Sequence, residues 1–157
     1  MDYSHPKCEN LMKIFTSNPK DEFINYQLEI ENKVLDVLRS GKYILGNELD
    51  KFENSFKEYI GSKYSVGVAN GTDALEISLR ALNIGPGDEV ITVSHTAVAT
   101  VSAILATGAK PVLIDIEEDF YTLDSSKLLA NYSKNTKAII AVHLYGQPCD
   151  LEKIKKF

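Results

Sequence analysis

The sequence predicts an α/β fold in which a mostly parallel sheet is flanked by helices. After Gly61, short apolar runs rich in β-branched residues alternate with segments of helical periodicity, and this alternation is typical of βαβ units. The chain has 157 residues, of which 44% are hydrophobic and 25% are charged. That composition is ordinary for a globular domain, and the length is sufficient to bury a core.

The first sixty residues predict a lead-in followed by two helices. Residues 1–20 are polar and contain two prolines, so we expect an irregular segment there. In residues 21–40 the apolar side chains recur at helical spacing and predict one amphipathic helix that ends at Gly41. A second apolar stripe over residues 49–60 predicts another helix, which Gly61 closes.

The rest of the chain predicts four strands and their connecting helices. Each apolar run is compatible with a buried parallel strand, and each segment between runs has helical periodicity. The predicted strands are residues 66–69, 90–93, 112–116 and 138–142. The predicted helices are residues 73–82, 96–107 and 125–132.

The last residues predict the start of a further helix. Asp150 is a suitable N-cap, and LEKIKKF is amphipathic with no Gly, Asn or Pro to end it. Domain boundaries normally fall in exposed linkers. We therefore expect a truncated domain.

Charge and cysteine usage argue against several classes of protein. The net charge is −5 and arginine occurs only twice, whereas nucleic-acid binding rests on clustered Lys and Arg. Cys8 and Cys149 fit neither a disulfide framework nor a CxxC site, so a reducing cytoplasm is expected. There is no apolar run of about 18 residues and no signal-peptide core, so we expect no membrane span. The acidic residues 115–119 lack a nearby His or Cys and predict a solvated loop, not a metal site.

The segment VGVANGTDALE is the first candidate ligand site. A tight turn at Asn70 and Gly71 follows the predicted strand. The helix then begins at Thr72 or Asp73, and Glu76 is placed as in a capping box. The first turn of such a helix suits a phosphate, because its N–H groups are free and the helix dipole is positive there. Plain helix capping is the alternative; neither GxGxxG nor GxxxxGK[ST] is matched.

The segment GPGDEVITVSHTAVAT is the second candidate. Ser94, His95 and Thr96 follow the predicted strand 90–93, and ligands of parallel sheets bind at the carboxyl ends of strands. His95 and Thr96 are therefore placed where a cofactor can bind. The alternative is that Ser94 or Thr96 caps the next helix and His95 is an ordinary loop residue.

The segment VHLYGQPCD is the third candidate and again follows a predicted strand. His143, Tyr145 and Gln147 are placed to contact a substrate or a neighbouring subunit. The favoured interpretation is a buried turn whose polar atoms are internally paired.

In their order along residues 21–157, these motifs resemble the DegT/DnrJ/EryC1/StrS family of sugar aminotransferases. The resemblance extends from SGKYILGNELDKF through GTDALEISLRALNIGPGDEVITVSHTAVAT to TKAIIAVHLYGQPCDLEKI. It implies part of the large domain of the aspartate-aminotransferase fold (PLP fold type I) and pyridoxal phosphate as the cofactor. It also implies transfer of an amino group, usually from glutamate, to a keto group on a nucleotide-linked sugar. Products of such enzymes enter lipopolysaccharide, other surface glycans or antibiotic sugars, and the family is usually homodimeric.

The resemblance implies roles for individual residues. The phosphate-binding turn of the family falls on Gly71, Thr72 and Asp73. Tyr43, within the YILG stretch, is implied to contact the sugar, and its alternative is packing against the first helix.

The cofactor-ring contact departs from the commoner pattern. Many members have an aromatic residue directly after the threonine that matches Thr96, and this chain has Ala97 there. The resemblance therefore implies that the cofactor ring lies against Ala97 and that His95 supplies the stacking face instead.

The resemblance also implies that the chain is an N-terminal fragment without a catalytic residue. In the family, the aspartate that pairs with the pyridine nitrogen and the lysine that forms the Schiff base lie beyond the matched part. We therefore expect a chain that is inactive and marginally stable by itself. One alternative is a non-catalytic binding or dimerisation module, or half of a split enzyme, that pairs with a second chain carrying the lysine. Another is a dehydrogenase-like nucleotide-binding domain, which the missing glycine fingerprint disfavours.

Overall fold

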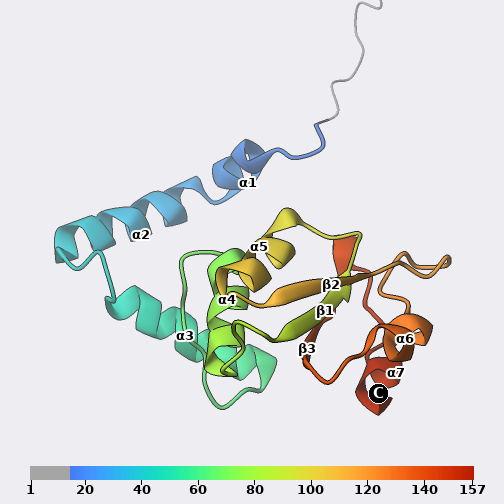
Figure 1. Ribbon diagram of the computed structural model, residues 1–157. Coiled ribbons are helices and arrows are strands. Elements are labelled where there is room, and N and C mark those ends of the chain that lie inside the picture. Colours follow the sequence, from blue (N-terminus) through green and yellow to red (C-terminus); the bar gives the residue numbers. More distant parts are fainter. Residues whose placement is uncertain (1–14) are drawn as a thin grey trace, which may run out of the picture. The chain divides into compact units, whose positions relative to one another are not determined.

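The computed structural model describes residues 15–157 and divides them into two compact units (Figure 1). The first unit extends to Val66 and consists of helices, and the second begins at Gly67 and contains a sheet. None of the helices within residues 15–157 is both long and apolar enough to cross a membrane.

In the first unit, two helices take the place of the single helix that the sequence predicted over residues 21–40. The structure has α1 (Pro19–Asn25) and α2 (Gln27–Ser40), separated at Tyr26. The backbone of Tyr26 leaves the helical region, with φ −121° and ψ 18°. The prediction of one continuous helix is therefore wrong, because neither Gly nor Pro marks the break and the apolar spacing continues across it.

The expected lead-in lies mostly outside the described residues. Pro19 and Lys20, which were assigned to it, already belong to α1. Proline suits the first helical turn because its φ is preset and its missing N–H would have no intrahelical acceptor there.

The third helix of the first unit, α3 (Asn47–Ile60), confirms the second predicted helix. Gly41 and Gly61 take the left-handed conformation after α2 and α3 and provide the expected helix ends. No residue of α1, α2 or α3 is buried.

The second unit is built on a parallel three-stranded sheet in the order β2-β1-β3. Three of the predicted strands are present, and β2 and β3 begin two residues earlier than predicted. Lys110 joins the start of β2, where its ammonium group lies 2.9 Å from the Glu89 carboxylate of β1. The strands are β1 (Glu89–Val93), β2 (Lys110–Ile114) and β3 (Thr136–Ile140). The other elements are α4 (Gly71–Ala81), α5 (Val98–Ala106), η1 (Ser125–Lys127), α6 (Leu128–Asn131), η2 (Leu144–Gly146) and α7 (Leu151–Lys156).

The strand predicted at residues 66–69 is not formed, so this prediction is wrong. A strand exists only where its backbone pairs with a neighbouring strand, and the sheet of the second unit contains β2, β1 and β3 only. The segment also crosses the boundary between the two units, and Val66 is 77% exposed. Its apolar run indicated a tendency towards extended structure, but pairing decides whether a strand forms.

Helices α4 and α5 pack against each other and cover one face of the sheet (Figure 1). Leu79 of α4 and Ile104 of α5 pack with Val90 of β1 in one buried cluster. A guanidinium N–H of Arg80 donates to the carbonyl oxygen of Ala106 at 2.6 Å and so ties the end of α4 to the end of α5.

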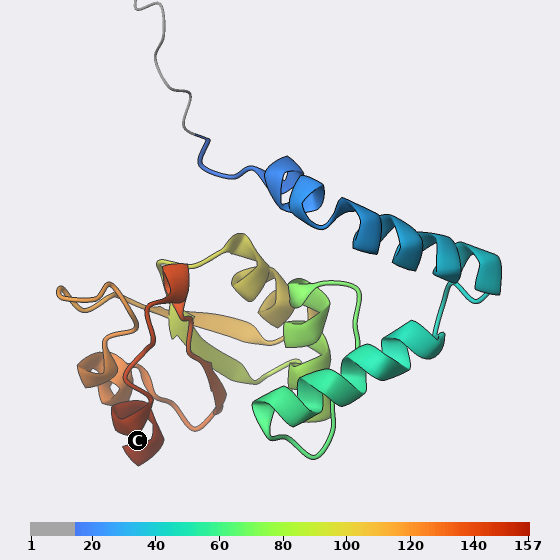
Figure 2. The same cartoon turned by 180° about the vertical axis from the view of Figure 1, so that it is seen from behind.

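The opposite face of the sheet is covered by the C-terminal segments, as Figure 2 shows from behind. Ile91, which alternates with Val90 along β1, packs there with Leu128 of α6 and Ile154 of α7. The helix predicted over residues 125–132 is a short 3₁₀ turn, η1, followed by one turn of α6. The unit thus has three layers with the sheet in the middle.

The loop after β2 is organised by the carboxylate of Glu117. One of its oxygens accepts the backbone N–H groups of Phe120 at 2.8 Å and Thr122 at 3.2 Å, and the other accepts that of Asp119 at 2.9 Å. Desolvation acts to raise the pKa of Glu117, but these donations outweigh it and lower the pKa from its ordinary value. Within residues 15–157, no group of three or more metal-ligating side chains is arranged to hold a metal ion.

We expect Ile91→Ala to lower the free energy of unfolding by about 2–5 kcal/mol, because Ile91 is fully buried at the centre of the sheet. Leu113→Ala on the neighbouring strand is the control, since Leu113 is 51% exposed and should cost less than about 1 kcal/mol. Urea unfolding followed by circular dichroism measures both. Equal losses would contradict the assignment of Ile91, and not Leu113, to the core.

We expect the amide signals of Phe120 and Thr122 to titrate together, with an apparent pKa below 4.5, the ordinary value for Glu117. Because the folded pKa is lowered, the loop is stabilised above pH 4.5 and loses this stabilisation as the pH falls through the folded pKa. NMR titration measures this. Glu117→Gln should abolish the transition and Glu118→Gln should leave it intact; an apparent pKa above 4.5 would contradict the assignment.

Candidate functional site

The candidate site lies at the edge of the sheet where the three parallel strands end. Parallel strands share one carboxyl edge, so the loops after β1, β2 and β3 come together there, and ligands of such sheets bind at this edge. The edge is held by two cross-strand bonds. The Thr92 hydroxyl donates to the carbonyl of Ile140 at 3.1 Å, and the N–H of Ser94 donates to the carbonyl of Ile114 at 2.7 Å.

Helix α4 begins with a reciprocal cap between Asn70 and Asp73. The side-chain oxygen of Asn70 accepts the backbone N–H of Asp73 at 2.9 Å, and its amide donates to the Asp73 carboxylate at 3.1 Å. The helix therefore starts at Gly71, earlier than predicted, and the expected capping role of Glu76 is wrong. A cap reaches the third helical residue, which is Asp73 when Asn70 is the N-cap. Glu76 instead forms an ion pair with Arg80 at 2.8 Å.

The first turn of α4 has the features that a phosphate site requires. The first N–H groups of a helix have no intrahelical acceptor, and the helix dipole is positive at that end. Asn70 accepts one of these groups, that of Asp73, and Gly71 and Thr72 precede it. A methyl group at Gly71 would meet no heavy atom within 4 Å, so the backbone there is open to a ligand. Gly71, Thr72 and Asp73 together fit the phosphate group of a cofactor.

The loop between β1 and α5 places His95 and Ala97 at the same edge. His95 is exposed, and its imidazole makes an edge-on contact with the ring of Tyr145, with centroids 6.4 Å apart and planes at 70°. Ala97 is exposed and occupies the N-cap position of α5 in an extended conformation. The hydroxyl groups of Thr96 and Thr100 are hydrogen-bonded at 2.8 Å. The alternative that Ser94 or Thr96 caps α5 is therefore not what the structure shows.

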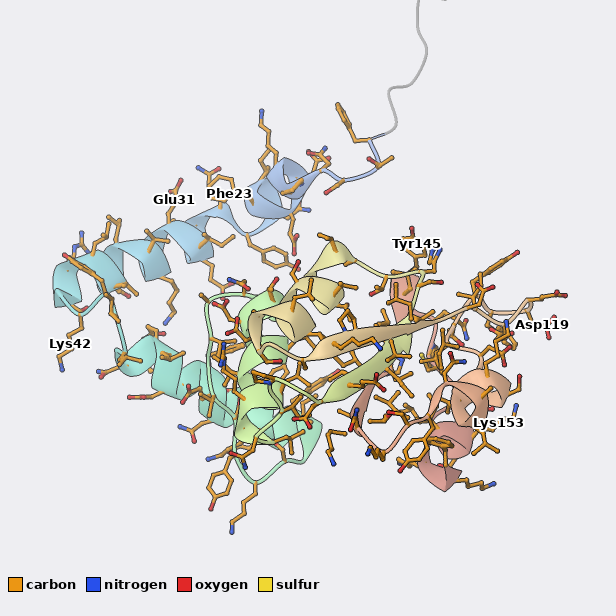
Figure 3. The ribbon with its side chains drawn as sticks, in the orientation of Figure 1. Phe23, Glu31, Lys42, Asp119, Tyr145 and Lys153 are labelled. Carbon is orange, nitrogen blue, oxygen red and sulfur yellow. The ribbon has the colours of Figure 1, made fainter. Side chains whose placement is uncertain are left out.

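The loop after β3 is partly paired internally, as the favoured interpretation expected, but it is not the buried turn predicted, because most of its residues are exposed. The imidazole Nδ1 of His143 accepts the backbone N–H of Cys149 at 3.0 Å, and the buried Cys149 thiol donates to the carbonyl of Val142 at 2.8 Å. Tyr145 differs, because its side chain is 94% exposed and its φ is +54°. Figure 3 labels Tyr145 on this loop and Asp119 on the loop after β2. Cys8 lies outside the described residues.

Tyr43 belongs to the first unit, in the turn between α2 and α3. Its hydroxyl donates to the carbonyl of Leu38 in α2 at 3.1 Å, and its side chain lines a pocket of about 320 Å³ formed by this turn. The structure therefore shows the packing against the first helix that was its alternative role.

Sequence reasoning missed two aromatic residues on the loop after β2. Phe120 and Tyr121 are each 60% exposed and line a pocket of about 500 Å³ that also contains His95. The sequence did contain a signal for them, because two aromatic residues come directly after an acidic run and that run follows a strand. The pocket is lined by His95, Asp119, Phe120, Tyr121, Tyr145 and Gln147, among others.

The chain is similar to curated proteins and to proteins of known structure. A curated relative, the dTDP-3-amino-3,6-dideoxy-alpha-D-galactopyranose transaminase of Aneurinibacillus thermoaerophilus, is 50% identical over 131 residues, which are 83% of this chain and 36% of the relative. The crystal structure of DesV from S. venezuelae matches with a TM-score of 0.86 and 42% identity over 88% of this chain and 38% of that one. NtdA from Bacillus subtilis, solved with bound PMP, matches with a TM-score of 0.83 and 32% identity over 97% of this chain and 35% of that one.

These matches show the fold and the family. The chain spans little more than a third of the length of these relatives, and its fold is part of the α/β fold of the pyridoxal-phosphate aminotransferases. The sequence model of the DegT/DnrJ/EryC1/StrS aminotransferase family, whose members depend on pyridoxal phosphate, matches residues 25–157. That range includes the first turn of α4 and all three strand-end loops. The chain therefore belongs to the DegT/DnrJ/EryC1/StrS aminotransferase family.

Proposed function

We propose that the second unit supplies the phosphate-binding and ring-contacting parts of a pyridoxal-phosphate site. The enzyme concerned transfers an amino group, from glutamate, to a keto group of a nucleotide-linked sugar. The observation that carries this proposal is the open first turn of α4, in the same unit as a parallel sheet whose strand-end loops carry His95 and Ala97. Pyridoxal phosphate, when bound, supplies an electron sink for the reaction at the substrate carbon.

The residues of the chain have separate tasks in this proposal. The backbone N–H groups of Gly71 and Thr72 bind the phosphate, and the Asn70 cap keeps them aligned by fixing Asp73. His95, whose ring is exposed, contacts one face of the cofactor ring, and the small Ala97 leaves room beside it. A neutral or charged imidazole can stack in this way, so the task of His95 is to orient the ring.

Two observations support our proposals for substrate binding: the name of a relative, and the position of Tyr43 in the turn after α2. The dTDP-linked amino sugar in the name of the first relative supports a nucleotide-linked keto-sugar as the substrate. Tyr43 is proposed to contact the sugar through its exposed ring, since its hydroxyl is already bonded to Leu38. We further propose a homodimer in the cytoplasm that contributes amino sugars to lipopolysaccharide or another glycan.

We also propose that this chain does not complete the reaction by itself. The chemistry needs a lysine amine that reaches the cofactor. In the described part of the chain, the pocket that contains His95 is lined by no lysine. The lysine of the family motif is then supplied from outside residues 15–157.

We expect Gly71→Ala to weaken the binding of pyridoxal phosphate at least about tenfold. The added methyl group would occupy the space through which the phosphate approaches the backbone, and the loss of one charge-assisted hydrogen bond costs about 1.5–3 kcal/mol. The added methyl meets open space within the chain, so the free energy of unfolding should not fall. Gly85→Ala is the control, since its methyl would lie 3.6 Å from the Thr107 carbonyl oxygen, an ordinary contact. Fluorescence titration with pyridoxal phosphate and with pyridoxal measures the effect. Equal binding of the two compounds would refute the phosphate site.

We expect no 2-oxoglutarate when the chain is incubated with pyridoxal phosphate, glutamate and a keto-sugar nucleotide. The physical reason is the absence of a lysine from the described pocket. A complete member of the family, assayed in parallel, shows that the assay works. Repeated turnover by this chain would contradict its proposed dependence on an outside lysine.

A further inference from the structure

Two tyrosines with left-handed backbone conformations line the same pocket. Tyr121 has φ +58° and Tyr145 has φ +54°, and both border the pocket of about 500 Å³ that contains His95. This conformation is unfavourable for a residue with a side chain. It persists only where the surrounding structure enforces it, and such residues gather at active sites and ligand clamps.

Separate sets of hydrogen bonds hold these two backbones. Around Tyr121, the Glu117 carboxylate accepts the N–H groups of Phe120 and Thr122. Around Tyr145, the N–H of Gly146 donates to the carbonyl of His143 at 3.1 Å, and the N–H of Gln147 donates to that of Leu144 at 3.0 Å. The aromatic rings are therefore presented on two fixed loops.

The rings carried by these loops are open to solvent. Phe120 and Tyr121 are each 60% exposed and Tyr145 is 94% exposed, although all three line a pocket. Asp119 and Gln147 add a carboxylate and an amide to the same lining. Apolar walls with a few polar groups are typical of small-molecule sites, and a volume of about 500 Å³ is in the range of such sites.

A pyranose ring matches this combination of groups. One face of a pyranose carries C–H bonds, which pack on aromatic rings, and its rim carries hydroxyl groups. A carboxylate accepts hydrogen bonds from hydroxyl groups, and a side-chain amide both donates and accepts them. The chemistry of the pocket thus fits a sugar better than it fits an anion, because none of the described residues that line it is Lys or Arg.

We propose that this pocket, here called the aromatic pocket, binds the sugar ring of the nucleotide-linked substrate, with Tyr145 as its main stacking surface. The proposal rests on the proposed function. His95 lines the aromatic pocket and is also the proposed contact of the cofactor ring. The part of the substrate that reacts at the cofactor is the sugar, and the base is separated from it by the pyrophosphate. The group that extends from the cofactor ring at His95 into the aromatic pocket is therefore the sugar ring.

The test is an NMR titration of the 157-residue chain, in the presence of pyridoxal phosphate, with UDP-N-acetylglucosamine and, separately, with UDP. We expect the sugar nucleotide to shift the amide signals of Tyr121, Tyr145 and Gln147, and UDP to leave them unchanged. Shifts of equal size with UDP would place the base or the pyrophosphate in the aromatic pocket and overturn the proposal. Absence of shifts with both probes would overturn it as well.

Variants at Tyr145 separate binding from folding. Tyr145→Gly removes the ring and relieves the left-handed backbone, so the fold should be kept while the affinity for UDP-N-acetylglucosamine falls at least threefold to tenfold. Tyr145→Phe keeps the ring and should bind like the unchanged chain. Tyr59→Ala, at a tyrosine of α3 that is 86% exposed, is the control and should have no effect. Full affinity in Tyr145→Gly would overturn the proposal.

Two further outcomes are distinguishable. If pyridoxal phosphate binds in a Gly71-dependent way but the sugar nucleotide leaves the aromatic pocket unshifted, the pocket assignment fails and the proposed function stands. If the Tyr145 signals change with protein concentration and not with sugar nucleotide, the pocket is a contact surface between copies of the chain, and the proposal is wrong.

Discussion

The parallel pairing of β1 with both β2 and β3 is the constraint on which the rest of the second unit depends. Parallel strands must all end at one edge, so three loops that are far apart in sequence meet there. The bonds from Thr92 to Ile140 and from Ser94 to Ile114 fix the ends of the strands. His95, Asp119 and Tyr145 therefore line one pocket although long stretches of sequence separate them.

The layers that cover the two faces of the sheet hold its carboxyl edge in place. The clusters on the two faces of β1 bury its alternating side chains completely, and burial of this kind is the main favourable contribution to folding. The bond from Arg80 to the carbonyl of Ala106 links α4 to α5. The turn at Gly71 and the loop at His95 are consequently carried by helices that are packed on each other. By contrast, α1 to α3 bury no residue.

The candidate site combines an open backbone with enforced loop conformations. At Gly71 the absence of a side chain leaves the helix start accessible, whereas Tyr121 and Tyr145 keep large side chains on left-handed backbones. The first arrangement suits an anion that must approach the main chain. The second is unfavourable unless the position of the rings is useful. The family match covers both regions.

The sequence alone determined the features that depend on neighbouring residues. The three sheet strands, the turn before α4, the glycine helix ends and the family are all expressed in short segments, because periodicity and turn chemistry act over a few residues. Tertiary structure decided that residues 66–69 form no strand, and it assembled the aromatic pocket around Tyr145. Each of these depends on which distant segment is adjacent in space, and a local pattern contains no record of that.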